Sequence, residues 1–344
     1  MPEFVQTSAA EVQRFAEALF VQAGVEPAAA RTVAEALTQA ELQGVATHGL
    51  QQAPIYLRRL LAGSLSGLAT VEAVHQSGAV AVYDGGLVLG HVAAAQVMDE
   101  LILRSRAFGV AVSAVHTATH FGVSGRYARQ AADAGLIGIV LCNTRPMLPA
   151  PEGAKAVVGN NPLAIAVPCA GRAPVVLDMA LSATSMGRVR LAASAGQRLP
   201  AGIALDSDGT PTTDPAKAIQ GMLLPAAGAK GFGLALMIDF LCALSGGKAG
   251  AEILSNYTGV ETPADCSWLF LALDPAHFGL SGDYGARVAE IAAGLGGASL
   301  PGDRKLAAEA AAEGKITLPQ ELVTTLETLS ADMAGAASAR LGRL

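Results

Sequence analysis

Between Ala79 and Asn143 the chain alternates between short apolar runs and longer amphipathic segments. The runs AVAVYD, GVAVSAV and LIGIVLCN have the length and the small or β-branched residues of buried strands. The segments between them, residues 91–109 and 124–134, carry apolar side chains at helical spacing. Strands that alternate with helices favour an α/β fold, in which helices cover a sheet whose strands are buried on both faces.

Further apolar runs extend this layer. We expect additional strands at residues 163–168, 174–179 and 267–275. Helices are expected on both sides of the layer and within its second half, at residues 9–23, 26–43, 53–61, 185–195, 231–247 and from 283 onward. The segment 231–247 is predicted to be a buried helix because its residues are almost all apolar.

The change from helices to strands near residues 64–78, and the return of helices near 276–282, suggest three parts. We expect an N-terminal helical segment over residues 1–75, a central α/β domain over 76–278 and a C-terminal helical segment over 279–344. A chain of 344 residues is long enough for a sizeable core of this kind.

Composition excludes several classes of function. The net charge of −6, without any block of lysine and arginine, disfavours a nucleic-acid or anionic-membrane partner. The most apolar run, Phe232 to Leu244, contains Asp239 and is shorter than the ~20 residues that a bilayer span requires. The first residues lack the pattern of a signal peptide. The four cysteines form no CxxC pair, so we expect reduced thiols, a cytoplasmic protein and no metal site: Cys142, Cys169, Cys242 and Cys266.

Two histidines stand where a site could form. His120 follows an apolar strand and precedes a glycine-containing turn and a helix, where backbone N–H groups can bind an anion. An ordinary strand-to-helix turn explains the same pattern equally well. His48 lies between Thr47 and Gly49 before a helix, where it could transfer a proton near neutral pH, although a capping or surface histidine is the simpler interpretation.

Several charged or amide residues follow other strands. Arg145 follows the strand at 136–143 and could bind a carboxylate with both arms of its guanidinium, or lie at the rim of a loop. Asp178 ends a strand and could contact a ribose or cap a helix. Lys230 precedes a glycine at a helix start and could contact a phosphate, without forming a Walker motif. Asn160 lies in a turn, and Arg188 and Arg190 lie in a helix that otherwise has a buried pattern.

Six blocks of the sequence resemble the type-2 malate/L-lactate dehydrogenase family of NAD(P)-dependent oxidoreductases. This family includes sulfolactate and ureidoglycolate dehydrogenases and the reductases of piperideine- and pyrroline-2-carboxylate. The blocks are THGLQQAPIYLRRLLAG, HFGVSGRYARQAADAGLIGI, GNNPLAIAVP, LDMALSATSMGRVRLAA, ALDSDGTPTTDP and LLPAAGAKGFGLALMID. The resemblance implies a mixed seven-stranded sheet sandwiched by helices, a non-classical NAD(P)-binding fold in which residues 76–278 bind the cofactor. It also implies that the N- and C-terminal segments pack together as a helical layer, and that the protein is a homodimer or a dimer of dimers.

The resemblance also implies roles for individual residues. Thr47, His48 and His120 would form the catalytic group, with either histidine as the proton shuttle. The nicotinamide cofactor, NAD or NADP, would contact His120, Phe121, Gly122, Val123, Ser124, Asp178, Met179, Ala180, Met186, Gly187, Ala229, Lys230, Gly231, Pro301, Gly302, Asp303 and Arg304.

The chain departs from the family pattern at the substrate-binding positions. Gln52 stands where an arginine usually binds the substrate carboxylate, and Asn160 stands where a threonine is usual. Arg188 replaces the aspartate of the cyclic ketimine reductases and the lysine of many hydroxyacid members. We therefore expect Arg145 or Arg188 to bind the carboxylate of a small anionic acid.

The favoured hypothesis is an NAD(P)-dependent oxidoreductase that transfers a hydride between nicotinamide and C2 of a small 2-oxo or 2-hydroxy acid. A cyclic ketimine reductase is the first alternative, and Arg188 argues against it because a cationic imine would be repelled. An inactive ligand-binding homologue is the second, supported only by the loss of arginine at Gln52.

Overall fold

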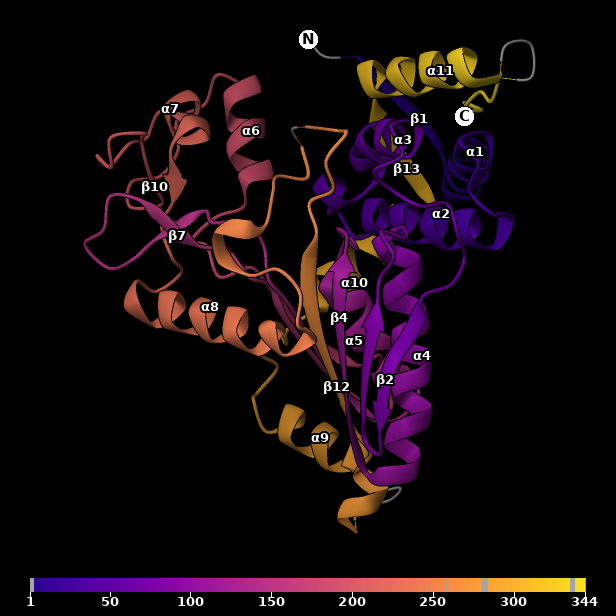
Figure 1. The fold of residues 1–344 in the computed structure, drawn as a ribbon, viewed down its shortest axis with the longest axis vertical. Coiled ribbons are helices and arrows are strands. Elements are labelled where there is room, and N and C mark those ends of the chain that lie inside the picture. Colours follow the sequence, from indigo (N-terminus) through magenta and orange to yellow (C-terminus); the bar gives the residue numbers. More distant parts are fainter. Residues whose placement is uncertain (1–2, 258, 280–283, 335–337, 344) are drawn as a thin grey trace.

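A seven-stranded mixed sheet forms the centre of the molecule (Figure 1). The computed structural model describes residues 3–257, 259–279, 284–334 and 338–343. The strand order is β2-β3-β4-β12-β5-β8-β9. Only the pair β3–β4 is parallel among neighbouring strands of this sheet. The strands are β2 (Glu72–Ser77), β3 (Val80–Asp84), β4 (Val110–Ala118), β5 (Ile137–Cys142), β8 (Leu163–Val167), β9 (Val175–Met179) and β12 (Cys266–Leu273). The expected α/β fold with a mixed seven-stranded sheet is confirmed.

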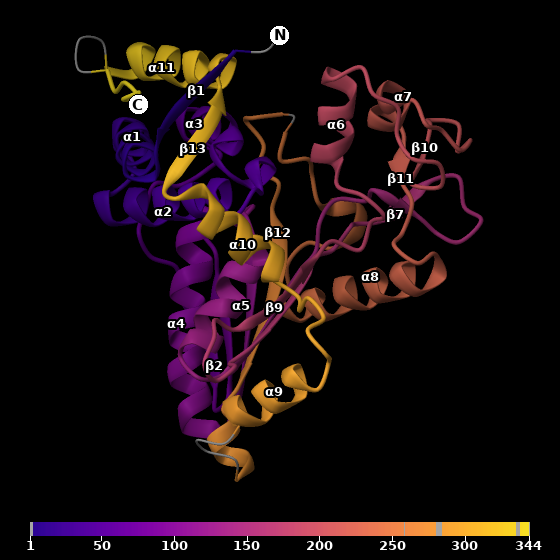
Figure 2. The same ribbon diagram turned by 180° about the vertical axis from the view of Figure 1, so that it is seen from behind.

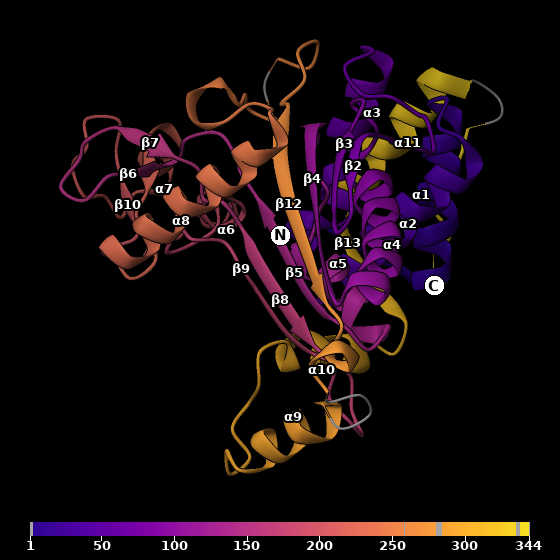
Figure 3. The same ribbon diagram turned by 60° about the horizontal axis from the view of Figure 1, so that its bottom comes forward.

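Strand β12 lies between β4 and β5 and pairs antiparallel with both (Figure 3). Its Trp268 and Phe270 are completely buried and stack at 5.7 Å between ring centroids. The strands β4 and β5 follow each other in sequence. In the sheet they are separated by β12, which begins more than 120 residues after β5 ends.

On the central strands of the sheet, successive residues point to two separate cores. On one face Val115, Val140 and Phe270 pack with helices α4 (Gly90–Phe108) and α5 (Ser124–Asp133). On the opposite face Leu141 and Leu269 pack under helix α8 (Ala229–Cys242). Both faces of the sheet are therefore covered, as the continuous apolar runs require.

Helix α8 differs from the expectation in two respects. It begins at Ala229, so Lys230 lies inside its first turn and does not precede it. It also buries only one face, because Leu234, Met237 and Phe240 are between 42% and 59% exposed. The expectation of a fully buried helix is wrong: an apolar sequence on every side does not establish that every side is covered. The short helix η3 (Ala243–Ser245) follows it directly.

A lobe of short elements adjoins α8 (Figure 1). Its members are β6 (Leu148–Pro149), β7 (Ala156–Val158), α6 (Met186–Ser194), β10 (Ala204–Leu205), α7 (Pro215–Gln220) and β11 (Met222–Leu223). Strand pairs β6–β7 and β10–β11 hold its loops. Only Val189 of α6 is buried, so the expected buried pattern of this helix is wrong, and both of its arginines are exposed.

The two ends of the chain form a layer beside the sheet (Figure 2). Strand β1 (Phe4–Ser8) pairs antiparallel with β13 (Lys315–Pro319). Around this pair lie α1 (Ala9–Gln22), α2 (Pro27–Leu42), α3 (Ala53–Leu61) and α11 (Gln320–Ala334). The division at 75/76 and 278/279 stays a proposal, and the expected boundary region 276–282 partly lies outside the described residues.

Three elements complete the C-terminal part. They are η5 (Pro275–Phe278), α9 (Tyr284–Ala293) and α10 (Asp303–Ala312). The turn before α10 is attached to the edge of the sheet, because Pro301 O accepts a hydrogen bond of 3.1 Å from Val176 N. No helix in the described ranges combines the length and hydropathy that a membrane span needs.

Candidate active site

His48 and His120 lie face to face at the junction of the terminal layer and the sheet. His48 ends the short helix η1 (Ala46–His48), and His120 lies in the turn between β4 and α5. Their ring centroids are 5.7 Å apart, and the ring planes differ by 26°. Residues from two layers, 72 positions apart in sequence, therefore meet in one place.

Each imidazole is fixed through its Nδ1 atom. Thr47 Oγ1 lies 3.0 Å from His48 Nδ1, and the Tyr56 hydroxyl lies 2.5 Å from His120 Nδ1. Among the hydrogen bonds of the described residues, none involves Nε2 of either ring. Nε2 is thus the nitrogen of each ring that can face a ligand. Tyr56, on α3, belongs to this group although the sequence analysis did not select it.

Burial keeps these histidines neutral. Desolvation is the main cause that lowers the pKa of His48, with Asp178 opposing the shift and Lys305 adding to it. Desolvation also lowers the pKa of His120 well below its usual value, and the neighbouring His48 and His91 lower it further. A third imidazole, His91, is 1% exposed, and desolvation lowers its pKa to about 3. Uncharged imidazole can accept a proton, so the site is suited to deprotonating a ligand hydroxyl.

Asp178 lies beside the histidine pair and is held by an ion pair. Its Oδ2 is 2.5 Å from Nζ of Lys305 on α10. Gly125 makes room for it, because a Cβ at that position would lie 2.9 Å from Asp178 Cβ. The expected role of Asp178 in cofactor binding thus applies to a carboxylate that already has a cationic partner. Lys305 was missed in the sequence, where the expected segment ended one residue earlier, at Arg304.

Gln52 does not offer an N–H group to a carboxylate. Its Nε2 donates to Thr47 O at 2.6 Å and to the Tyr257 hydroxyl at 3.0 Å. The carbonyl oxygen of Thr47 can only accept, which fixes the orientation of the amide. The remaining oxygen, Oε1, is buried without a hydrogen-bond partner. Gln52 therefore connects the His48 turn to the loop that carries Tyr257.

Arg145 and Arg190 lie near Tyr257. The guanidinium carbon of Arg190, on α6, lies 4.6 Å from the centroid of the Tyr257 ring. Arg145 is partly buried, and its pKa is lowered by desolvation and by Arg190, with Tyr257 opposing. Arg188 is exposed, and its backbone N–H donates to Ser185 Oγ. Of the two arginines on α6, the structure thus brings Arg190, and not the expected Arg188, to Arg145 and Tyr257.

Asn160 supports the loop of Arg145. Its Oδ1 accepts a hydrogen bond of 3.0 Å from Thr144 Oγ1, and its carbonyl accepts one of 2.8 Å from Leu181 N. Neighbouring Asn161 is completely buried and accepts from Thr144 N at 2.9 Å. The turn expected at these asparagines therefore positions the residue before Arg145.

Most of the remaining expected cofactor residues lie at the starts of α5, α6, α8 and α10, whereas Met179 ends β9 and Ala180 follows it. Val123 is the N-cap of α5 and Gly228 the N-cap of α8, and neither helix has a side-chain cap. Gly122 has a φ of +77°, and a Cβ there would lie 2.7 Å from His91 Nε2. Gly187, at the start of α6, lies so close to Thr47 that a Cβ would collide with it. The contacts around Lys230 and around Pro301–Arg304 do not include either histidine of the pair.

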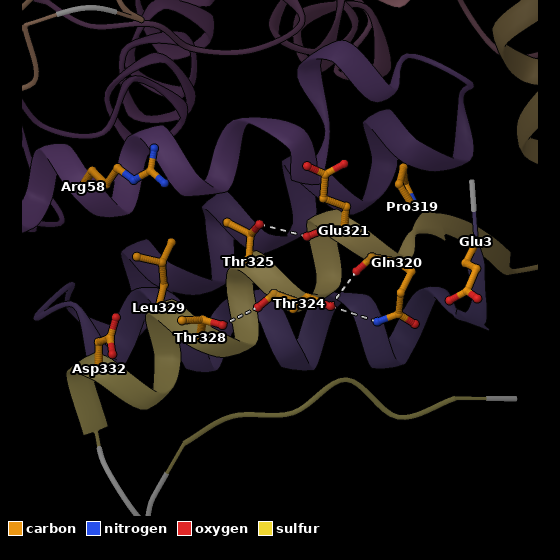
Figure 4. A pocket seen from close by; sticks show the side chains of 10 residues that line it. All are labelled: Glu3, Arg58, Pro319, Gln320, Glu321, Thr324, Thr325, Thr328, Leu329 and Asp332. Carbon is orange, nitrogen blue, oxygen red and sulfur yellow. Dashed lines mark hydrogen bonds between the residues drawn. The ribbon is translucent and has the colours of Figure 1, made fainter. Parts of the chain in front are cut away.

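Two surface hollows lie elsewhere. One of about 700 Å³ is lined by α11 and by Arg58 of α3 (Figure 4). Another, of about 460 Å³, is lined by Cys169, Arg172 and Asp303 together with residues of α9. The first contains none of the expected site residues, and the second adjoins only the expected segment 301–304. Within the described ranges no group of three or more His, Cys, Asp or Glu is placed to hold a metal ion.

Known proteins match both the sequence and this fold. The model of the malate/L-lactate dehydrogenase family matches residues 7–327. The chain belongs to this family. It is 35% identical over 321 residues to the (2R)-3-sulfolactate dehydrogenase (NADP(+)) of Chromohalobacter salexigens, covering 92% of this chain and 95% of that one. It is 36% identical over 257 residues to a Delta(1)-pyrroline-2-carboxylate/Delta(1)-piperideine-2-carboxylate reductase of Pseudomonas putida, covering 74% and 75% of the two chains.

A solved structure extends the likeness to three dimensions. The sulfolactate dehydrogenase from Methanocaldococcus jannaschii superimposes with a TM-score of 0.89 at 29% identity, over 95% of this chain and 97% of that one. Membership of the family and its mixed-sheet fold are thus supported by independent comparisons.

Proposed function

We propose that the protein is an NAD(P)-dependent oxidoreductase that transfers a hydride between nicotinamide and C2 of a small 2-oxo or 2-hydroxy acid. The observation that carries this proposal is the stacked pair His48–His120, which is partly buried and uncharged. Hydrogen bonds through Thr47 and Gln52 connect this pair to Tyr257, on whose ring Arg190 lies. The family and the relatives named for sulfolactate dehydrogenation support the same reaction class. One relative is named as NADP(+)-dependent, which supports a nicotinamide cofactor but does not decide between NAD and NADP for this chain.

The residues present fit such a cofactor. The starts of α5 and α8 lack side-chain caps, so their backbone N–H groups are suited to phosphate oxygens. Gly228 has a positive φ of +61° and open space where a Cβ would lie, so a ligand can come close to this turn. Exposed Lys230 adds a positive charge at the second helix start. When bound, the cofactor supplies or accepts the hydride.

The histidine pair transfers the proton of the substrate hydroxyl. Burial raises the pKa of Tyr56 well above its usual value, so its hydroxyl stays protonated and can donate to His120 Nδ1. His120 then carries its own proton on Nε2 and can donate to the substrate oxygen. Only His48 has Asp178 among the groups that raise its pKa. We therefore assign proton acceptance in alcohol oxidation to His48 Nε2 and orientation of the oxygen to His120.

A pH profile tests this assignment. The pKa of His48 lies below the usual value of 6.5, so kcat/KM for oxidation should fall to half of its plateau value only below pH 6.5. Replacement of His48 by asparagine should abolish this acid limb, whereas replacement of His120 should lower the plateau. An unchanged profile in the His48 variant would show that another group accepts the proton.

Arg145 is assigned to the carboxylate beside C2. It is partly buried, and in the described ranges it forms no ion pair with the protein. A charge-assisted hydrogen bond of this kind contributes about 1.5–3 kcal/mol. Arg145→Ala should therefore raise KM about 10- to 100-fold, and Arg188→Ala should leave it unchanged. A higher KM in Arg188→Ala, with an unchanged KM in Arg145→Ala, would assign the carboxylate to Arg188.

Substrate assays test the proposed function as a whole. Purified protein with NADH or NADPH and a panel of 2-oxo acids should consume the reduced cofactor, measured by its near-ultraviolet absorbance. Turnover of cyclic imines alone would favour the reductase activity named for the Pseudomonas putida relative. Failure to bind either reduced cofactor in a fluorescence titration would indicate an inactive ligand-binding homologue.

Assembly and location belong to the same proposal. A homodimer or dimer of dimers would cover apolar side chains of α8 that the single chain leaves exposed, Met237 and Phe240 among them. All four cysteines are unpaired, which supports a cytoplasmic protein. Light scattering coupled to size-exclusion chromatography would contradict the assembly if it gave the mass of one chain at micromolar concentration.

A further inference from the structure

We propose that Arg190, resting on the ring of Tyr257, binds a second negative charge of the substrate, so that the site prefers dianionic 2-hydroxy acids to monoanionic ones. Dicarboxylates and sulfonated carboxylates have the required chemistry. The inference rests on the proposed function, because it assigns a substrate class to the same site.

The ring of Tyr257 is a fixed platform. Its hydroxyl accepts a hydrogen bond of 3.0 Å from Gln52 Nε2. Arg59, which is 1% exposed, donates to the carbonyls of three residues in the same loop. These bonds run to Ser255 O at 3.0 Å, Asn256 O at 3.1 Å and Thr262 O at 2.7 Å. The loop is thus attached to α3, the helix whose Tyr56 holds His120.

Arg190 has a geometry that leaves its donors available. A guanidinium 4.6 Å from the ring centroid is attracted by the aromatic face, which does not use its N–H groups. The planar edge of the guanidinium can then donate two parallel hydrogen bonds to a carboxylate or sulfonate. Stacking already restricts the Arg190 side chain, so this side chain loses less conformational entropy when it binds an anion.

The local charge favours a ligand with more than one anionic group. Arg190 lies on the Tyr257 ring, and its charge helps to lower the pKa of nearby Arg145, so the two cations repel each other. No ion pair of the described residues includes either one. A monoanion bound to Arg145 neutralises only one of the two charges. A substrate with a second acidic group can neutralise both, so the repulsion favours dianions and disfavours the shorter monoanions.

A chain of hydrogen bonds connects the platform to the histidine pair. Thr47 contacts His48 through its hydroxyl and Gln52 through its carbonyl, and Gln52 contacts Tyr257. Two side chains and one backbone group therefore separate the proton-transfer atoms from the platform.

Steady-state kinetics with matched substrates tests the inference. Values of kcat/KM are measured for 2-hydroxybutanedioate, 3-sulfolactate and 2-hydroxypropanoate with both cofactors, in the wild type and in Arg190→Gln. We expect a dianion preference in the wild type, and Arg190→Gln should lower kcat/KM for the dianions about 10- to 100-fold, mainly through KM. The value for the monoanion should change less than about twofold.

Control variants separate the anion contact from packing. Arg198→Gln removes another exposed arginine, hydrogen-bonded only to Thr213, and should leave the preference unchanged. Tyr257→Phe keeps the platform and should retain most of the preference, whereas Tyr257→Ala should lose it. Equal kcat/KM for both charge classes in the wild type, or a dianion preference that survives Arg190→Gln, would overturn this inference alone. Absence of turnover with every acid would overturn the proposed function, and the inference with it.

Discussion

Glu41 holds the turn that carries His48, and its charge should make the stability of the protein depend on pH. Its Oε1 accepts a hydrogen bond of 2.7 Å from Leu50 N, and Gly49 lies directly against the carboxyl group. Burial raises the pKa of Glu41 from 4.5 to about 7, with the hydrogen bond from Leu50 opposing the shift. Between these two pH values the folded protein binds a proton that the unfolded chain has lost.

The sign and size of the effect follow from this difference. The folded state is favoured by protonation, so the contribution of Glu41 to stability is greatest below pH 4.5 and is lost as the pH rises to about 7. A shift from 4.5 to about 7 corresponds to at most about 3 kcal/mol, at 1.36 kcal/mol for each unit. Glu41→Gln retains an acceptor for Leu50 and removes the ionisation, so the variant should gain stability relative to the wild type as the pH rises.

Urea denaturation at pH 5, 6, 7 and 8 measures the effect. The free energy of unfolding of the variant minus that of the wild type should increase by about 2–3 kcal/mol between pH 5 and pH 8. Glu35→Gln, on an exposed position of the same helix, is the matched control and should show no such trend. A change of less than about 0.5 kcal/mol for the Glu41 variant would show that burial does not disfavour its charge.

Three further substitutions address the site. Gly187→Ala places a methyl group against Thr47 and should lower kcat/KM at least about tenfold without unfolding the protein, whereas Gly233→Ala, which has open space, should be silent in the same assay. Arg59→Met leaves three loop carbonyls without a donor and should lower the free energy of unfolding by about 3 kcal/mol in urea titrations; a change below about 1 kcal/mol would contradict its clamping role. Tyr56→Phe removes the hydroxyl that fixes the buried histidine and should lower kcat about tenfold with little change in KM, measured by initial rates; a change confined to KM would contradict this.

The sequence predicted most strands but not their order. The apolar runs of β4 and β5 are clear from local spacing, whereas the insertion of β12 between them depends on contacts more than 120 residues apart. Strand β1 could not be recognised, because its five residues pair only with β13 at the other end of the chain. Pairing of distant segments leaves no local pattern in the sequence.

The site shows the same limit. Motif resemblance selected His48 and His120, which the structure brings together. The residues that fix the two imidazoles or add positive charge near Tyr257 have no distinctive sequence pattern. Tyr56 lies in a regular helical pattern, and Tyr257 lies in a loop without a motif. The sequence places Arg190 only in a helix with a buried pattern, whereas its exposure on α6 is what makes the proposed anion contact possible.

Deuterium transfer tests the central claim most directly. The protein is incubated with a dianionic 2-oxo acid and NADH or NADPH labelled with deuterium at C4, in each stereoisomer, and the product is examined by mass spectrometry and NMR. The account predicts that one of the two stereoisomers gives a 2-hydroxy acid with a single deuterium at C2. A 2-hydroxy acid without deuterium from both stereoisomers, or oxidation of the cofactor without formation of this product, would contradict it.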